Sequence, residues 1–328
     1  MLLSDMKHKP RFPIRRIVRD LIIAAGVGAA LVIAYLFGTF DGRDSRRAML
    51  SLPALQQQQA RLHGNPPASA APPTVQPRAS VAPAMPPWQR NAAPAPIKSG
   101  QPLIVLVIDD MGLDRKRSAR AVALPPPLTL AYLPYASDLP AQTAAARAAG
   151  HELLVHVPME PDNAAEDPGP HAIRAATGDG EILSELDWML GRFNGYVGIN
   201  NHMGSRLTRD AGRMSVVLAD VKRRGLLFLD SRTTAQSVAG DTARRLGVPM
   251  AERDVFLDAV EQPAQVRAQL ADLELRARVQ GHAIAIGHPK DVTLDALDYW
   301  MPQARANGFA FAPLTAVIGA LPRAAVSR

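Results

Sequence analysis

The run LIVLVIDDMG, Leu103 to Gly112, has the composition and length of a buried strand that ends in two acids. Its six leading residues are apolar and form an unbroken run of strand length. Two carboxylates, Asp109 and Asp110, follow directly, and Gly112 closes the run. A strand that ends in adjacent acids indicates a functional site at its carboxyl end.

Apolar runs of this kind recur along the chain, with helical patterns between them. The clearest helix is predicted over Pro263–Gln280, with Val266, Leu270, Leu273 and Ala277 on one stripe. Several helices end in a C-capping glycine just before the next strand, namely Gly150, Gly225, Gly281 and Gly308. The other predicted strands are LTLAYLP (128–134), ELLVHVPM (152–159), YVGINN (196–201), LLFLDS (226–231), DVFLD (254–258), HAIAIGH (282–288) and FAFAPL (309–314).

Regular alternation of strand and helix implies a parallel sheet in the α/β class. Seven to eight such units within about 220 residues favour a closed or nearly closed (β/α) barrel. We therefore predict a barrel domain over residues 101–322, with its site at the C-terminal ends of the strands. An open, doubly wound sheet is the structural alternative.

A membrane anchor is predicted before this domain. The stretch LIIAAGVGAALVIAYLFGTF, residues 21–40, has no charge and is long enough to cross a bilayer of about 30 Å as a helix. Residues 1–20 are basic, and the positive-inside rule keeps them in the cytoplasm. We expect a single-pass inner-membrane protein whose domain lies in the periplasm. A cleaved signal peptide is the alternative.

Residues 41–100 are predicted to form a disordered linker. Between Gly64 and Gly100, 10 of the 37 residues are proline, interleaved with Ala, Ser and Gln. This composition is typical of an extended, semi-stiff spacer rather than of a packed core.

The formal net charge of +7 is unevenly distributed. Residues 1–100 hold 13 Lys and Arg against 4 Asp and Glu, whereas residues 101–328 hold 24 against 26. The predicted domain therefore offers no electrostatic footprint for nucleic acid. The chain has no cysteine, which excludes thiolate chemistry and is compatible with an oxidising periplasm.

Polar side chains follow five of the predicted strands, at the end where a barrel carries its site. Of eight histidines, only His156, His202 and His288 reach this end, and imidazole with carboxylate is the ligand chemistry of Zn²⁺ or a similar divalent ion. A lone histidine is more often a core residue, and one aspartate of the pair could instead cap a helix. Two successive aspartates before a glycine are better explained as a metal ligand and a base.

Five stretches, IDDMG, GHELLVHVPMEP, GINNHMGSR, LFLDSRTT and AIAIGHP, resemble the motifs of the divergent polysaccharide deacetylase family. The resemblance covers residues 103–320. It implies a distorted (β/α) barrel and a metal-dependent hydrolase ancestry, with a divalent metal ion such as Zn²⁺ as cofactor.

In the larger polysaccharide deacetylase group, an Asp-Asp pair supplies a catalytic base and a metal ligand, which implies these roles for Asp109 and Asp110. Of the two metal histidines of that group, this chain retains His156 but has Glu160 in the second place. The group's Arg-x-Pro-Tyr loop is replaced by NNHMGSR. We infer that His202 is the third metal ligand, with Glu160 as its rival.

The resemblance further implies that His288 protonates the leaving amine. The remaining polar residues would line the pocket, hold substrate or orient His202: Asn200, Asn201, Ser205, Arg206, Asp230, Ser231 and Arg232. The implied reaction removes an N-acyl (acetyl) group from an envelope glycan, such as peptidoglycan or another amino-sugar polymer. The departures from the group's motifs leave open an alternative, a non-catalytic glycan-binding or envelope-assembly module. The retained Asp109 favours the enzyme.

Overall fold

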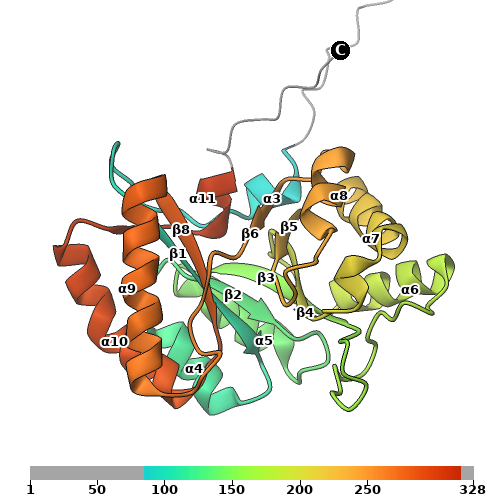
Figure 1. Ribbon diagram of the computed structural model, residues 1–328, viewed down its shortest axis with the longest axis horizontal. Helices are drawn as coiled ribbons and strands as arrows, with labels where there is room; N and C mark the ends of the chain where they lie inside the picture. Colours follow the sequence, from blue (N-terminus) through green and yellow to red (C-terminus); the bar gives the residue numbers. More distant parts are fainter. Residues whose placement is uncertain (1–84, 319–328) are drawn as a thin grey trace, which may run out of the picture. The chain divides into compact units, whose positions relative to one another are not determined.

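The computed structural model describes residues 85–318 (Figure 1). The predicted anchor over residues 21–40 and most of the predicted linker lie outside these residues. Within the described part of the chain, no helix has both the length and the apolar character needed to cross a membrane.

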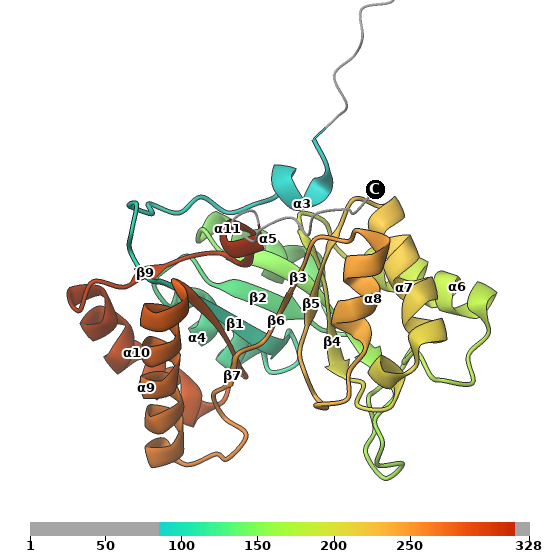
Figure 2. The ribbon, with the colours of Figure 1, turned by 45° about the horizontal axis from the view of Figure 1, so that its top comes forward.

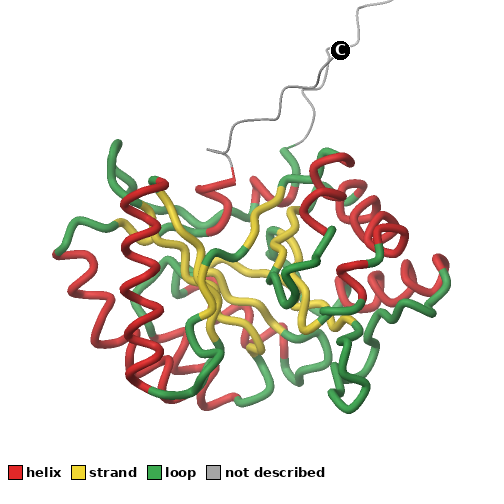
Figure 3. Tube along the Cα trace, in the orientation of Figure 1, coloured by secondary structure: helices red, strands yellow, loops and turns green. Residues whose placement is uncertain are grey.

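The core is a parallel sheet that curls into a half-barrel, as expected of a distorted (β/α) barrel (Figures 1 and 3). Its strands follow the order β6-β5-β4-β3-β2-β1-β8-β7, and β9 pairs with β1. A doubly wound sheet would reverse its strand order at a switch point, and this sheet does not. The strands are β1 (Leu103–Met111), β2 (Thr129–Tyr132), β3 (Glu152–Met159), β4 (Gly198–Met203), β5 (Leu227–Asp230), β6 (Met250–Glu252), β7 (Val255–Phe256), β8 (His282–Gly287) and β9 (Ala310–Phe311).

One short segment forms both edges of the sheet. Strand β6 pairs with β5, strand β7 pairs with β8, and only Arg253 and Asp254 separate the two. The Arg253 N–H donates to the Asp230 carbonyl at 3.0 Å, and the Asp254 N–H donates to the Ile284 carbonyl at 2.9 Å. The chain therefore crosses from one edge to the other within two residues. Strand β6 was not predicted, because three residues carry no readable periodicity.

Helices cover the outer face of the sheet, with α9 and α10 on the β8 side and α6 to α8 on the β4–β5 side (Figure 2). The predicted helix over Pro263–Gln280 is confirmed as α9, and its buried residues are the four of the predicted stripe. The helices are α3 (Pro87–Arg90), α4 (Arg115–Ala123), α5 (Leu139–Ala148), α6 (Asp179–Leu190), α7 (Ala211–Arg223), α8 (Ala239–Leu246), α9 (Pro263–Gln280), α10 (Asp291–Ala306) and α11 (Leu314–Ile318), with a 3₁₀ turn at Leu207–Arg209.

Successive side chains along a strand belong alternately to two apolar clusters, one on each face of the sheet. On β1, Ile104, Leu106 and Ile108 pack outward under the helices, while Val105 and Val107 belong to a smaller inner cluster. Side chains two residues apart lie on the same face of a strand. The inner face of each strand therefore carries apolar residues first and a polar residue at its carboxyl end, and these polar residues of neighbouring strands lie close together.

Residues 85–100 fall within the predicted linker, yet part of this segment packs on the domain. Trp88 of α3 packs against the inner cluster, and Ala93 is buried. The Asn91 side-chain amide donates to the Tyr196 carbonyl at 2.8 Å. Proline-rich composition predicted a spacer here, but these few residues cover the end of the barrel opposite the polar rim, where α11 also lies (Figures 1 and 2).

A buried carboxylate, Glu152 on β3, forms hydrogen bonds to this segment, to β2 and to α11. It accepts hydrogen bonds from the backbone N–H of Ala93 at 3.4 Å and of Thr315 at 3.1 Å. The Thr129 hydroxyl donates to it at 3.3 Å, and the Thr315 hydroxyl at 2.5 Å. Glu152 is fully buried, and this burial raises its pKa although the hydrogen bonds oppose the shift.

Candidate functional site

Four polar side chains form a layer on the inner face of the sheet, at the carboxyl ends of their strands. Each lies two residues after an apolar inner-face residue, so its side chain points into the barrel as well. The residues placed in this way are Asp109 after Val107, His156 after Leu154, Ser231 after Leu229 and His288 after Ile286.

Asp110 reaches the same side as Asp109 because the backbone leaves the strand geometry. Alternation alone would turn these neighbours to opposite faces. The φ angle of Asp110 is +53°, in the left-handed region that L-residues rarely adopt. The pairing of β1 with β2 is also irregular between Ile108 and Met111. This local strain brings both carboxylates to one site, which is where strained residues are often found.

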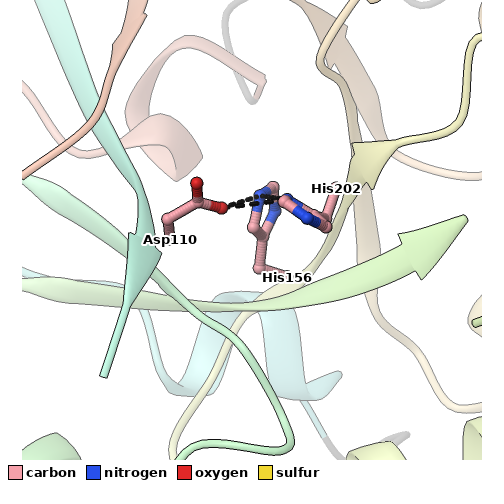
Figure 4. A group of neighbouring side chains, drawn as sticks. All are labelled: Asp110, His156 and His202. Atoms are coloured by element: carbon pink, nitrogen blue, oxygen red, sulfur yellow. Dashed lines mark hydrogen bonds and ion pairs between the residues drawn. The ribbon is translucent and has the colours of Figure 1, made fainter. Parts of the chain in front are cut away.

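Three side chains from three strands converge at this point (Figure 4). Asp110 Oδ1 lies 2.9 Å from His202 Nδ1 and 3.2 Å from His156 Nε2. The two ring nitrogens are 3.2 Å apart. Among residues 85–318, no group donates a hydrogen bond to the buried Asp110 Oδ1.

This arrangement fits a bound cation. Ligand atoms about 2.0–2.1 Å from a tetrahedral Zn²⁺ lie about 3.3 Å from one another. The three atoms of the cluster have nearly this spacing, and they combine a carboxylate oxygen with two imidazole nitrogens, which is a donor set suited to Zn²⁺. A cation would also satisfy the buried Asp110 oxygen.

Asn200 lies beneath the cluster and fixes its neighbours. Its Oδ1 is 2.9 Å from His156 Nδ1, so the His156 tautomer that donates to this oxygen keeps the Nε2 lone pair for the cluster. Its Nδ2 donates to Asp109 Oδ1 at 2.8 Å and to the Ser231 hydroxyl at 3.2 Å. One buried amide therefore orients both a candidate ligand and a candidate base.

The carboxylates of the site are held in different electrostatic states. Burial raises the pKa of Asp109, and the charges of His156 and His288 offset this only in part. Burial would raise the pKa of Asp110 too, but the adjacent His156 and His202 imidazoles lower it far below its ordinary value. Asp109 is the more basic carboxylate, and Asp110 stays ionised.

His288 stands across the pocket from the cluster, with its Nε2 3.8 Å from Asp110 Oδ2. Its Nδ1 lies 2.9 Å from Asp258 Oδ1, and its backbone N–H donates to Asp258 Oδ2. The Thr293 hydroxyl also donates to Asp258, at 2.7 Å. Burial would lower the pKa of His288, but the hydrogen bond and charge of Asp258 raise it. Asp258 was not predicted as a site residue, although its place at the end of the predicted strand 254–258 is the signal that marks the other rim residues.

These residues line a pocket of about 340 Å³. Its walls include Arg253, which the sequence analysis did not select because it lies in the two-residue connection between β6 and β7. The lining residues are Asp109, Asp110, His156, Asn201, His202, Met203, Ser231, Arg232, Thr233, Arg253, Phe256, Ile286 and His288. A larger hollow of about 720 Å³ lies between α9 and α10, away from this chemistry.

Glu160, the rival third ligand, lies apart from the cluster. Its Oε2 accepts the Ala175 N–H at 2.6 Å, and its Oε1 lies 3.6 Å from Arg206 Nη1. Ser205 accepts the Asp162 N–H at 2.8 Å. Ser205 and Arg206 thus organise the neighbouring loop and do not line the pocket.

Two further residues from the sequence analysis brace the strand ends. The side chain of Asp230 points to the opposite face of β5 from that of Ser231. It accepts hydrogen bonds from the Arg232 N–H at 2.8 Å and from the Ser237 hydroxyl at 2.7 Å. Asn201 lines the pocket but uses its amide on the backbone, accepting from the Ser231 N–H and donating to the Met203 carbonyl.

A parallel half-barrel with a carboxylate and histidine cluster at its carboxyl rim is a polysaccharide deacetylase-like fold. The chain matches the family described as divergent polysaccharide deacetylase over residues 106–318, and it belongs to that family. The resemblance seen in the sequence motifs is thereby confirmed.

Individual relatives agree with this membership. The chain is 35% identical over 199 residues to an uncharacterized protein of Haemophilus influenzae, covering 60% of this chain and 70% of the relative. It is 32% identical over 220 residues to the uncharacterized protein YibQ of Escherichia coli, covering 64% and 68%. The crystal structure of an uncharacterized protein of Agrobacterium tumefaciens shares 30% identity at a TM-score of 0.68, covering 71% of this chain and 95% of that one.

Proposed function

We propose that this protein is a metal-dependent hydrolase that removes an N-acyl group, such as acetyl, from an amino sugar of an envelope glycan. The observation that carries the proposal is the convergence of Asp110, His156 and His202 beside a second carboxylate, Asp109. Membership of the divergent polysaccharide deacetylase family supports a carbohydrate substrate.

The proposed roles follow from the contacts. Asp110, His156 and His202 would hold a divalent ion such as Zn²⁺. When bound, such an ion supplies Lewis acidity toward an acyl carbonyl and makes water a better nucleophile at neutral pH. Asn200 would keep His156 in the ligating tautomer.

Proton transfer is assigned to the two remaining groups. Asp109 has one oxygen held by Asn200 and the other, Oδ2, 3.6 Å from His156 Nε2 at the cluster, where it would accept a proton from the attacking water. His288 is oriented through Nδ1 by Asp258, so its Nε2 faces the pocket and would give a proton to the departing amine.

The cellular setting belongs to the same proposal. The uncharged run over residues 21–40 and its basic flank would anchor the chain in the inner membrane. The domain would then act on glycan in the periplasm. Its pocket of about 340 Å³ lies at the lower end of the range for small-molecule sites, which suits a single sugar residue or a chain end.

The test combines metal analysis with acyl release on the full chain. We expect the purified protein to bind about one divalent ion and to release acetate from N-acetylated glucosamine oligomers or from peptidoglycan. Asp109→Asn should keep the metal and slow acetate release by about 10²–10⁴-fold, the usual contribution of a general base. Asp110→Ala should lose the metal itself.

The same data decide the alternative of a non-catalytic glycan-binding module. Such a module would bind glycan without releasing acetate, and Asp109→Asn would leave that binding unchanged. The replacement of the Arg-x-Pro-Tyr loop by NNHMGSR is the observation that keeps this alternative.

A further inference from the structure

The pocket carries a guanidinium that the proposed chemistry does not use. Arg253 lines the pocket and is partly buried. Its Nε donates to the Ser231 carbonyl and its Nη2 to the Arg232 carbonyl, both at 2.7 Å. The guanidinium also lies 4.9 Å from the Phe256 ring, a cation–π distance. Its position is therefore fixed by three contacts.

None of these contacts neutralises its charge. Among residues 85–318, the ion pairs of the structure include no carboxylate partner for Arg253, and its Nη1 donates no hydrogen bond. Burial lowers the pKa of Arg253, although the charges of Asp109, Asp230 and Asp254 act from beyond ion-pair distance to raise it. A partly buried guanidinium that has no carboxylate in direct contact can pair with a carboxylate of a bound ligand.

The other pocket arginine differs in this respect. Arg232 Nη1 lies 3.2 Å from Glu252 Oε2, so its charge is already paired within the protein. With Arg232 paired to Glu252 and the imidazoles counted as neutral, the pocket wall carries the two negative charges of Asp109 and Asp110 against the one positive charge of Arg253. A bound divalent ion would make the lining net positive, which favours an anionic ligand.

We infer that Arg253 binds a carboxylate of the substrate, so that the acyl amino sugar taken by this site is itself acidic. The inference rests on the proposed function for the choice of an amino sugar, and it adds the charge of that sugar. A guanidinium whose Nε edge is occupied can still donate through Nη1, and such a charge-assisted bond discriminates strongly against a neutral analogue.

The test uses a matched pair of probes, N-acetylmuramic acid and its methyl ester, which differ in the charge of one lactyl arm. Binding to the metal-loaded full chain is measured by titration calorimetry. We expect the wild type to prefer the acid by on the order of 10–100-fold. Arg253→Met should remove the preference, and Arg253→Lys should keep part of it as a point charge.

Controls separate this inference from its rivals. Arg267→Met on α9 removes an exposed guanidinium that does not line the pocket and should keep the preference. Metal content and thermal melting establish that each variant is folded and loaded. If Arg253→Met does not fold, the partial preference expected of Arg253→Lys decides the matter.

Two results would overturn the inference. The wild type could bind acid and ester equally, or Arg253→Met could retain the full preference, which would assign the carboxylate to the metal ion. Acetate release is measured separately on both probes. Release without a preference for the acid contradicts only the inference, whereas a preference for the acid without release contradicts only the proposed reaction.

Discussion

At the scale of single residues, the site depends on which side chains reach the inner face of the sheet. His202 lies on the inner face of β4, and Asp110 turns to the same side through a positive φ. Glu160 lies one residue beyond β3 and is held by the Ala175 N–H. These placements make His202 a better candidate for the third ligand than Glu160.

The corresponding prediction concerns metal affinity. His202→Ala should weaken metal binding by at least about 100-fold, which exceeds the loss typical of an outer-shell partner. Glu160→Gln should change it little, because its side chain is committed to Ala175. Competition with a fluorescent chelator measures both. The opposite ranking would make Glu160 the ligand and NNHMGSR a substrate loop.

A second residue-scale prediction concerns Glu152 and pH. Its pKa is raised above the ordinary value of 4.5, so the folded protein holds this proton more tightly than the unfolded chain does. Its contribution to stability is complete below pH 4.5 and is lost as pH rises through the folded pKa. The neutral Glu152→Gln variant lacks this loss.

As pH rises above 4.5, we therefore expect the free energy of unfolding to fall in the wild type but not in Glu152→Gln. The difference between the two should grow by at most about 1.4 kcal/mol per pH unit, the limit for one proton. Urea unfolding at a series of pH values measures the difference. A difference independent of pH would show that Glu152 titrates alike in both states.

At the scale of elements, the segment around α3 belongs to the domain rather than to the spacer before it. Trp88 packs on the inner cluster, and the Ala93 N–H donates to the buried Glu152. Removing the segment would expose apolar surface and leave a buried carboxylate with one donor fewer. Both effects destabilise the fold.

We expect a fragment of residues 85–328 to be more stable than one of residues 101–328 by about 1–3 kcal/mol, the sum of a partly buried aromatic side chain and one or two hydrogen bonds. Denaturant unfolding of the two fragments checks this. A Trp88→Ala variant of the longer fragment should show part of the loss. Equal midpoints would restore residue 101 as the start of the domain.

At the scale of the whole molecule, the prediction concerns topology across the membrane. The charge-free run over residues 21–40 follows a basic segment, which orients the chain with its N-terminus in the cytoplasm. A reporter active only in the periplasm, fused after Gly100, should be active, and the protein should sediment with membranes. A shortened, soluble periplasmic product would instead indicate a cleaved signal peptide.

The class of the fold and the family could be predicted from sequence alone, as could the residues that meet at the carboxyl rim. Strand β3 has its predicted bounds, and α9 buries its predicted stripe, because long periodic runs report burial directly. The C-capping glycines Gly150, Gly225, Gly281 and Gly308 all have the positive φ that a C-cap requires. The predicted rim residues Asp110, His156 and His202 lie together for the same reason, since the carboxyl ends of parallel strands share one edge.

Features that depend on contacts between distant segments could be read from the folded structure alone. The order of the strands excluded a doubly wound sheet, and the crossing at Arg253 and Asp254 joined the two edges through a strand too short to predict. Hydrogen bonds to partners distant in the chain place Asp258 and Arg253 in the site and hold Glu160 outside it. Local sequence reports periodicity and conformational preference, whereas such partnerships arise only when the folded chain brings the partners together.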